Sequence, residues 1–286
     1  MYRTTGQSLV ALLAVGSLNF SLAAEPALGL AMARGTFRLD NSLVQGSATV
    51  LEGARLETER ASLEVQLNSG ARLGLAPASR GQFYRDRLVL ERGLGELRSG
   101  SGYAVEASGL RVVPAEPQAL ARVAFDKDSR VLVAALNGLV RVSTREGILL
   151  ANLPAGRTLA FSRQQPGAAP PVVVRGRLEQ REGHYLLTDE TSNVTFEVIG
   201  AELDKQVGQR VELTGILDPT AKPFPPASQV LKITRATRLG AAVPPAAAGL
   251  STGAKVAIIA GVTVAAVVGG LAAAGVFAGP AAPVSP

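Results

Sequence analysis

The stretch LNSGARLGLAPASRGQFYRDRLVLERGLGEL, residues 67–97, decides the fold. Apolar and polar residues alternate along it, which is the period-two pattern of half-buried β-strands. Turns with glycine separate the alternating runs, at Asn68-Ser69-Gly70 and at Arg92-Gly93. The pattern therefore predicts short antiparallel strands joined by tight turns.

The same alternation continues over residues 35–163. The further alternating sets are Leu63/Val65/Leu67, Val123/Phe125, Val131/Val133 and Leu159/Phe161. No stretch of this region has the spacing of an amphipathic helix. Strands that recur about every 8–12 residues favour a sandwich, barrel or solenoid over a βαβ fold.

A second β-rich region follows at residues 172–239. Linkers rich in Pro, Ala and Gly bound it at 164–171 and 240–253. A short helix over Ala201–Val207 is expected, because Leu203 and Val207 are spaced i and i+4. The strand candidates are Val172–Gln180, His184–Thr188, Asn193–Ile199, Gln209–Leu217 and Gln229–Arg238.

The first 24 residues have the layout of a secretory signal peptide. Arg3 lies in a short polar start, the stretch from Leu9 to Leu22 is apolar, and small residues close the segment. An uncleaved helix is the alternative. The leader predicts that the chain is exported.

Residues 256–277 are uncharged over a length of about 33 Å as a helix, enough for a bilayer core. We expect one transmembrane helix here, although a buried helix is the alternative. Small residues such as Gly261, Ala265 and Gly269 would allow such helices to self-associate. The positive-inside rule would place Lys255 in the cytoplasm. The leader places it outside, and we give the leader more weight because translocated domains are insensitive to flanking charge.

Composition excludes several kinds of chemistry. The chain has no cysteine and one histidine, so disulfides, cysteine-based zinc sites and sites with two histidines are impossible within one chain. No phosphate-binding glycine loop or nucleophile elbow is present. We expect no enzyme activity, no catalytic residue, no cofactor and no metal.

The net charge of +6 lies mostly in residues 34–163, where 18 basic residues face 13 acidic ones. These arginines alternate with glutamates and form no dense basic stripe, so a solvated surface is favoured over nucleic-acid binding.

One exposed cluster is a candidate binding patch. It consists of Arg80, Phe83, Tyr84, Arg85 and Arg87. Arginine and aromatic residues dominate binding hot spots. The alternative is a charged strand edge that prevents sheets from pairing.

Two polar features have simpler interpretations. The sequence predicts His184 to be an exposed hairpin residue, because no metal or catalytic partner is evident nearby. Asp126 and Asp128 lack the spacing of a calcium loop, and we expect a hairpin turn there.

Residues 67–97 and 131–161 (VLVAALNGLVRVSTREGILLANLPAGRTLAF) resemble the FecR-like domain in their turn glycines and apolar alternation. The resemblance implies an extracytoplasmic β-module used for interaction. Sigma-factor regulators of this family carry a cytoplasmic helical domain before the membrane helix. Here only about seven polar residues precede the apolar leader, so signalling by this chain alone is not expected.

The second region resembles the bacterial OB-fold, through GRLEQREGHYLLTDE (176–190) and VGQRVELTGIL (207–217). Gly176 and Gly183 would permit the tight bend and the hairpin of that barrel. OB-folds that bind single strands combine a positive groove with stacking aromatics. This region has equal numbers of basic and acidic residues, and Phe196 is expected in the core.

The sequence thus predicts an all-β protein with a FecR-like solenoid or sandwich at 35–163 and a five-stranded OB-like barrel at 172–239. The expected function is non-enzymatic: a binding or scaffold module on the periplasmic side, anchored in the membrane, with another envelope protein as partner. A part in FecR-type sigma-factor regulation and single-stranded nucleic-acid binding are the alternatives.

Overall fold

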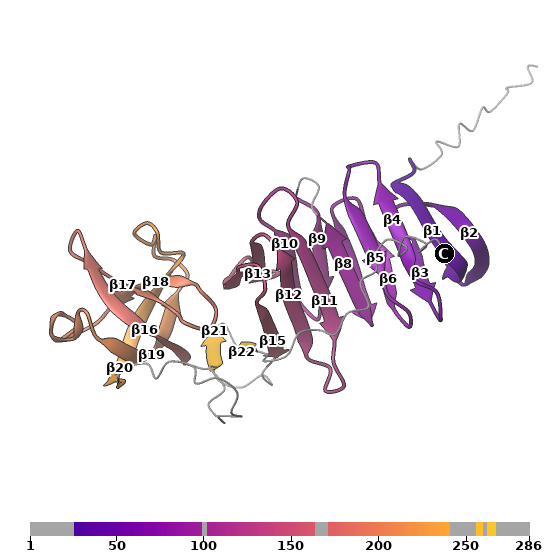
Figure 1. The fold of residues 1–286 in the computed structure, drawn as a ribbon. Helices are drawn as coiled ribbons and strands as arrows, with labels where there is room; N and C mark the ends of the chain where they lie inside the picture. Colours follow the sequence, from indigo (N-terminus) through magenta and orange to yellow (C-terminus); the bar gives the residue numbers. More distant parts are fainter. Residues whose placement is uncertain (1–25, 99–101, 164–170, 241–255, 260–261, 267–286) are drawn as a thin grey trace, which may run out of the picture.

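The computed structural model describes residues 26–98, 102–163, 171–240, 256–259 and 262–266 (Figure 1). It is built of β-strands, which confirms the all-β prediction. The expected signal segment 1–24 and nearly all of both linkers lie outside these residues. Figure 1 shows an elongated stack of strands with a barrel at one end.

Residues 29–163 form a two-layered sandwich. Its strands are β1 (Gly29–Leu39), β2 (Ser42–Val50), β3 (Arg55–Thr58), β4 (Leu63–Leu67), β5 (Arg72–Leu75), β6 (Arg80–Phe83), β7 (Arg87–Arg92), β8 (Leu94–Arg98), β9 (Ala104–Ala107), β10 (Leu110–Pro114), β11 (Leu120–Phe125), β12 (Val131–Asn137), β13 (Val140–Thr144), β14 (Leu149–Leu153) and β15 (Thr158–Arg163).

The pairings produce two rows that both start at β1. One row runs β1–β3–β6–β7–β9–β10–β13–β14. The other runs β1–β4–β5–β8–β11–β12–β15. Each hairpin lies within one row, and the chain then crosses to the other row. The sandwich therefore lengthens as the chain proceeds.

Strand β1 belongs to both rows because it bends. Its pairing with β2 shifts between Met32 and Thr36, and Gly35 there has a φ of 142°. Such a bulge kinks a strand and lets its two halves enter different sheets. The turn into β2 uses Asp40 and Asn41, both with positive φ, as tight hairpin turns prefer.

The alternation read from the sequence matches the core between the rows. Leu63, Val65 and Leu67 point inward from β4 and are buried, as are Leu73 and Leu75 on β5. The residues between them point outward. At about 25 cal/mol per Å² of apolar surface, this burial is the main stabilising term of the sandwich.

Residues 172–238 form the expected five-stranded barrel. Its strands are β16 (Val172–Arg181), β17 (His184–Thr188), β18 (Thr195–Ile199), β19 (Arg210–Asp218) and β20 (Gln229–Arg238). The order β16–β17–β18–β20–β19 returns to β16, and only β18 and β20 run parallel. Phe196 is fully buried inside, as predicted.

The glycines of the barrel act as expected. At Gly176 a Cβ would lie 2.2 Å from the Thr188 carbonyl oxygen, so only glycine allows β16 to approach so closely. Gly183 has a φ of 83° in the β16–β17 hairpin.

The predicted helix over 201–207 is wrong in extent. The structure has one 3-10 turn, η1 (Asp204–Gln206). Leu203 is buried, but Val207 is exposed, so only one of the two apolar residues packs against the barrel. Without the second contact a longer amphipathic helix gains little burial.

Part of the expected transmembrane segment 256–277 is described. It contains β21 (Val256–Ile259) and β22 (Val262–Ala266), which pair with each other, and β22 runs beside β15. These residues are extended where the sequence predicts a helix, and their β-branched composition suits strands. Residues 260–261 and 267–277 lie outside the described ranges.

None of the helices in the described ranges has the length and apolar character that crossing a bilayer requires. The membrane anchor stays a prediction.

Candidate interaction surfaces

The predicted binding patch lies at the turn between β6 and β7. The guanidinium carbon of Arg87 lies 4.5 Å from the centre of the Tyr84 ring, a cation–π contact. The side chain of Arg85 is 74% exposed, and its backbone N–H donates to Glu52 Oε1 at 3.2 Å. Tyr84, Arg85 and Arg87 therefore do gather on one surface.

Two of the five predicted residues do not belong to this surface. Phe83 is fully buried, because it is an inward-facing residue of β6. Arg80 lies at the other end of β6, where its Nη2 donates to Glu57 Oε2 at 2.8 Å, and Arg92 contacts the same carboxylate. These residues are close in sequence, but β6 places Arg80 at its far end and turns Phe83 into the core. We call the remaining three, Tyr84, Arg85 and Arg87, the Tyr84 patch.

A hollow of about 390 Å³ opens beside the Tyr84 patch. Its lining consists of Pro26, Ala27, Leu28, Leu67, Asn68, Ser69, Tyr84 and Arg85. The amide of Asn68 donates to the Ala27 carbonyl at 2.7 Å and closes one wall. The hollow thus has apolar walls with an arginine and a tyrosine at its rim.

Tyr103 fixes the backbone beneath the patch. Its hydroxyl donates to the Tyr84 carbonyl at 3.0 Å. Burial, together with the charges of Asp86 and Glu52, raises the pKa of Tyr103, so the phenol stays protonated and keeps donating at neutral pH. The rim of the hollow is therefore held in place by a partly buried hydrogen bond.

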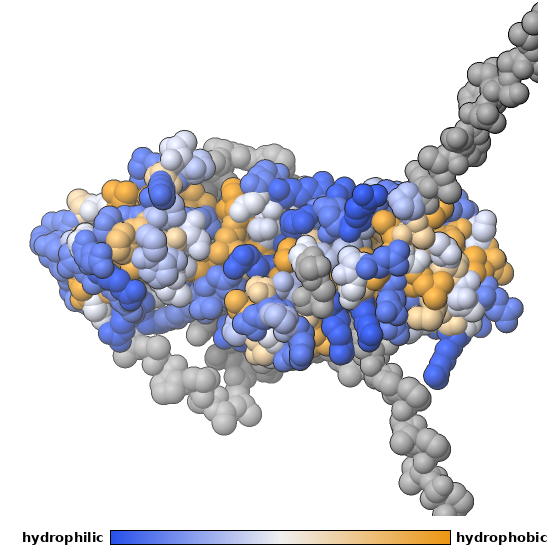
Figure 2. All heavy atoms as spheres, turned by 90° about the horizontal axis from the view of Figure 1, so that it is seen from above, coloured by the Kyte–Doolittle hydropathy of each residue, from blue (hydrophilic) through white to orange (hydrophobic). Residues whose placement is uncertain are grey.

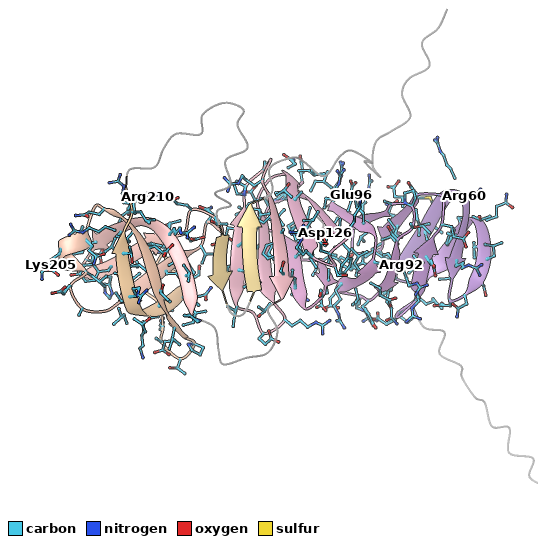
Figure 3. All side chains as sticks on the ribbon, turned by 90° about the horizontal axis from the view of Figure 1, so that it is seen from below. Arg60, Arg92, Glu96, Asp126, Lys205 and Arg210 are labelled. Carbon is cyan, nitrogen blue, oxygen red and sulfur yellow. The ribbon has the colours of Figure 1, made fainter. Side chains whose placement is uncertain are left out.

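Glu106 organises the arginines next to the patch, and sequence reasoning missed it. Its carboxylate lies 3.7 Å from Arg87, 3.1 Å from Arg111 and 3.5 Å from Arg145. Arg111 lies directly opposite Glu106 in the β9–β10 hairpin, whereas Arg87 and Arg145 reach Glu106 from other parts of the chain, which no linear spacing reveals. A central carboxylate holds cations that would otherwise repel each other. Figure 3 shows charged side chains along the whole sandwich.

The barrel has its own polar cluster around His184, a hairpin residue with a side chain that is 42% exposed and with partners that the sequence does not reveal. The ring of His184 stacks on Phe224 with centroids 4.1 Å apart. His184 Nδ1 lies 2.7 Å from Glu197 Oε1, and the Phe224 backbone N–H donates to Glu197 Oε2 at 2.7 Å. The cluster fastens the β19–β20 loop onto the outer face of β17 and β18.

The electrostatics of Glu197 follow from these contacts. Burial by itself raises the pKa of this carboxyl, but the hydrogen bonds from Phe224 and His184 outweigh it and leave the pKa below its ordinary value. The outer face of β17 and β18 is where OB-folds bind oligonucleotides. In this barrel the chain's own loop lies over that face.

A larger cleft of about 960 Å³ lies between the two modules. Its sandwich wall includes Arg141, Ile148 and Asn152, and its barrel wall includes Ile216 and Gln229. Three hydrogen bonds between described residues join the modules at its walls: Asn152 N–H to the Ser192 carbonyl at 2.8 Å, Asn152 Nδ2 to the Asn193 carbonyl at 3.3 Å, and Gln229 Nε2 to the Leu149 carbonyl at 2.6 Å. The barrel therefore satisfies polar groups on the outer edge of β14.

Asp126 forms the turn that the sequence predicts. Its carboxylate accepts from the backbone N–H groups of Asp128 and Arg130, each at 2.9 Å, and from the Arg130 side chain. Across the part of the chain that the structure describes, no group of three potential metal-ligating side chains comes together.

Comparisons with known proteins add little. No family model matches the chain, and no curated protein matches it. Among solved structures, a candidate anti-sigma factor from Parabacteroides distasonis matches with a TM-score of 0.31 and 17% identity. The match covers 37% of this chain and 53% of that one. At this level the likeness carries no argument, and the FecR-like resemblance rests on the sequence motifs alone.

Proposed function

We propose that this protein is a non-enzymatic, FecR-like binding and scaffold module of the cell envelope. Residues 1–24 direct its export, and the β-modules lie on the periplasmic side of the membrane. To hold the protein at the membrane as a helix, residues 256–277 would have to leave the pairing with β15 that β22 has in the structure. The partner is another envelope protein.

The Tyr84 patch is the observation that carries this proposal. It combines the exposed Arg85, the cation–π contact of Arg87 with the Tyr84 ring and a neighbouring apolar hollow. Arginine and tyrosine beside an apolar pocket are typical of the centre of protein interfaces. The patch also sits on a rigid sandwich, and a preorganised surface loses less entropy on binding.

Site-specific cross-linking tests the binding role. A photoreactive residue replaces Arg85 in the full chain, in cells that express the protein. We expect one discrete cross-linked product with a second protein of the same membrane fraction. The matched control is the same replacement at Arg60, an exposed arginine beyond the far end of β3.

With the photoreactive residue moved to Arg87, the double variant Tyr84→Ala/Arg85→Ala should lower the yield of that product about tenfold or more, as truncation of hot-spot residues does. Equal cross-linking at Arg60 and Arg85, or no loss in the double variant with an unchanged melting temperature, contradicts the proposal.

N-terminal sequencing of the chain from a membrane fraction tests the location. We expect the mature chain to begin shortly after residue 24. A full-length chain in the cytoplasm that still begins at Met1 contradicts export and, with it, the envelope role.

A further inference from the structure

Strand β2 is an open edge of the sandwich. Among the described residues β2 pairs with β1 alone, along Ser42–Gln45 and Ser47–Val50, while Gly46, with a φ of 82°, lies at the bulge between these two stretches. One row of its backbone N–H and C=O groups therefore faces away from the sandwich. Such an edge is a template for a further strand.

The far edges of the same two rows are covered. The barrel bonds to the outer edge of β14 through Ser192 and Gln229. On the other row, β22 pairs with β15 along Thr158–Arg163. The chain thus covers its own sheet edges at one end of the sandwich, while the β2 end stays unpaired.

The sequence of β2 has none of the charges or prolines that block edge pairing, and the bulge at Gly46 is the one such feature in the strand. SLVQGSATV contains no charged residue and no proline, in a chain where most exposed strands carry arginine or glutamate. Charges, prolines and inward-pointing polar groups are the usual protection of an edge. A second β2 strand would meet no like charge within this segment.

This end also leaves apolar surface uncovered. Leu43 is 66% exposed, and Leu30, Met32 and Leu51 are exposed as well. These are half of the large apolar side chains that are exposed in the described part of the chain. The inward residues Val44 and Ala48 pack on the core but are only partly buried. Figure 2 shows apolar residues on the surface at this end.

We infer that β2 is a self-association site, at which a second copy of this chain adds its own β2 antiparallel to the first. The pairing is two-fold symmetric about Gly46. It joins the sheets of two copies end to end, and an isologous contact of this kind closes at a dimer. This inference goes beyond the proposed function and does not depend on it.

The pattern of β2 fits this register. With Gly46 opposite its own copy, Val44 lies opposite the partner copy's Ala48, so inward residues meet inward residues. Gln45 lies opposite Ser47 of the other copy, and both are exposed. A shift by one residue would place inward residues opposite outward ones and break the common core. The alternation thus selects one register.

Charge reversal across the axis tests the contact in the full chain. In Gln45→Lys/Ser47→Lys each lysine faces a lysine of the other copy, at two symmetric places. We expect sedimentation equilibrium to show a dimer for the parent chain and at least about tenfold weaker association for this variant. The matched control Gln45→Glu/Ser47→Lys has the same altered positions but places Glu opposite Lys, and should dimerise as well as the parent.

The absence of cysteine allows a second measurement. Chains with Gln45→Cys are mixed with chains with Ser47→Cys and oxidised. Directly opposed residues have Cα atoms about 4.5–5.5 Å apart, within disulfide reach, whereas like positions lie farther apart. We expect disulfide-linked dimers in the mixture and few in either chain alone.

Three results would overturn the inference. The first is a monomer at every concentration. The second is association that both charge variants leave unchanged, which would place the contact elsewhere, for example in the apolar residues 256–277. The third is equal cross-linking in the mixed and unmixed cysteine chains. Unchanged melting temperatures establish that each variant is folded, since both positions are exposed.

Discussion

Arg122 donates from Nε to Glu96 Oε1 at 2.7 Å, between directly opposed positions of β11 and β8. Their side chains are only 6% and 1% exposed. Figure 3 shows Glu96 among the strands in the middle of the sandwich. A charge taken out of water is costly unless its partner stays in place. This pair is therefore the point at which a single polar substitution should damage the sandwich most.

Removing one partner should destabilise the protein strongly. We expect Glu96→Gln or Arg122→Met to lower the free energy of unfolding by about 3–5 kcal/mol, because each breaks this buried pair of charges. The double variant Glu96→Leu/Arg122→Met should recover most of that loss. Urea unfolding measures all four proteins. Additive losses in the double variant would show that the two side chains do not depend on each other.

The sequence predicts the face of these residues but not their burial. Leu97 and Val123 point into the core, so alternation correctly places Glu96 and Arg122 on the other face of their row. Alternation alone implies that such residues are solvated, and here both are buried. Period two indicates which side of a strand a residue occupies, whereas burial depends on what lies over that side.

The candidate site shows the same division. The alternating strands and the exposure of Arg85 were predictable from the residues themselves. Glu106 was not, because Arg87 and Arg145, which are distant in sequence, reach it only after β7, β9 and the loop after β13 are arranged side by side. His184 likewise meets Phe224 only because the long β19–β20 loop folds back over the barrel. Local patterns predict strands and turns, whereas these clusters depend on tertiary contacts.

Gly176 should tolerate no side chain. A Cβ there would lie 2.2 Å from a backbone oxygen, so Gly176→Ala forces β16 away from the end of β17 and should cost about 3 kcal/mol. Gly183→Ala is the matched control. No atom lies within 4 Å of its Cβ, and only the positive φ opposes it, at about 1–2 kcal/mol. Thermal unfolding compares the two, and equal losses would mean that the close approach at Gly176 is unimportant.

Acid should weaken the contact between Glu197 and the β19–β20 loop. The folded-state pKa of Glu197 lies below the ordinary 4.5, so its ionised form stabilises the folded protein above that pH, and this stability is lost as the pH falls through the lower folded-state pKa. Glu197→Gln should cost about 1.5 kcal/mol near neutral pH and reduce the loss of stability on acidification.

Urea unfolding between about pH 3 and 7 measures this dependence. Glu179→Gln, at an exposed position of β16, controls for the loss of one negative charge. If the Glu197 and Glu179 variants follow the same pH curve, the hydrogen bonds from Phe224 and His184 do not set the behaviour of Glu197.

The junction between the modules should depend on Gln229. Its amide donates to the Leu149 carbonyl on β14, three residues before Asn152, whose N–H donates to Ser192 of the barrel. Gln229→Ala removes the first bond and leaves an interface carbonyl without that donor, which costs about 1–2 kcal/mol of docking energy. Hydrogen exchange at the Asn152 amide reports the effect, because this amide is protected only while the barrel is docked. We expect exchange to accelerate by about tenfold, the equivalent of 1.4 kcal/mol.

Gln180→Ala, on the exposed hairpin of the barrel, is the control and should leave exchange at the Asn152 amide unchanged. Unaltered exchange in Gln229→Ala would mean that the barrel is held against β14 by other contacts, and that this glutamine only fills the wall of the cleft.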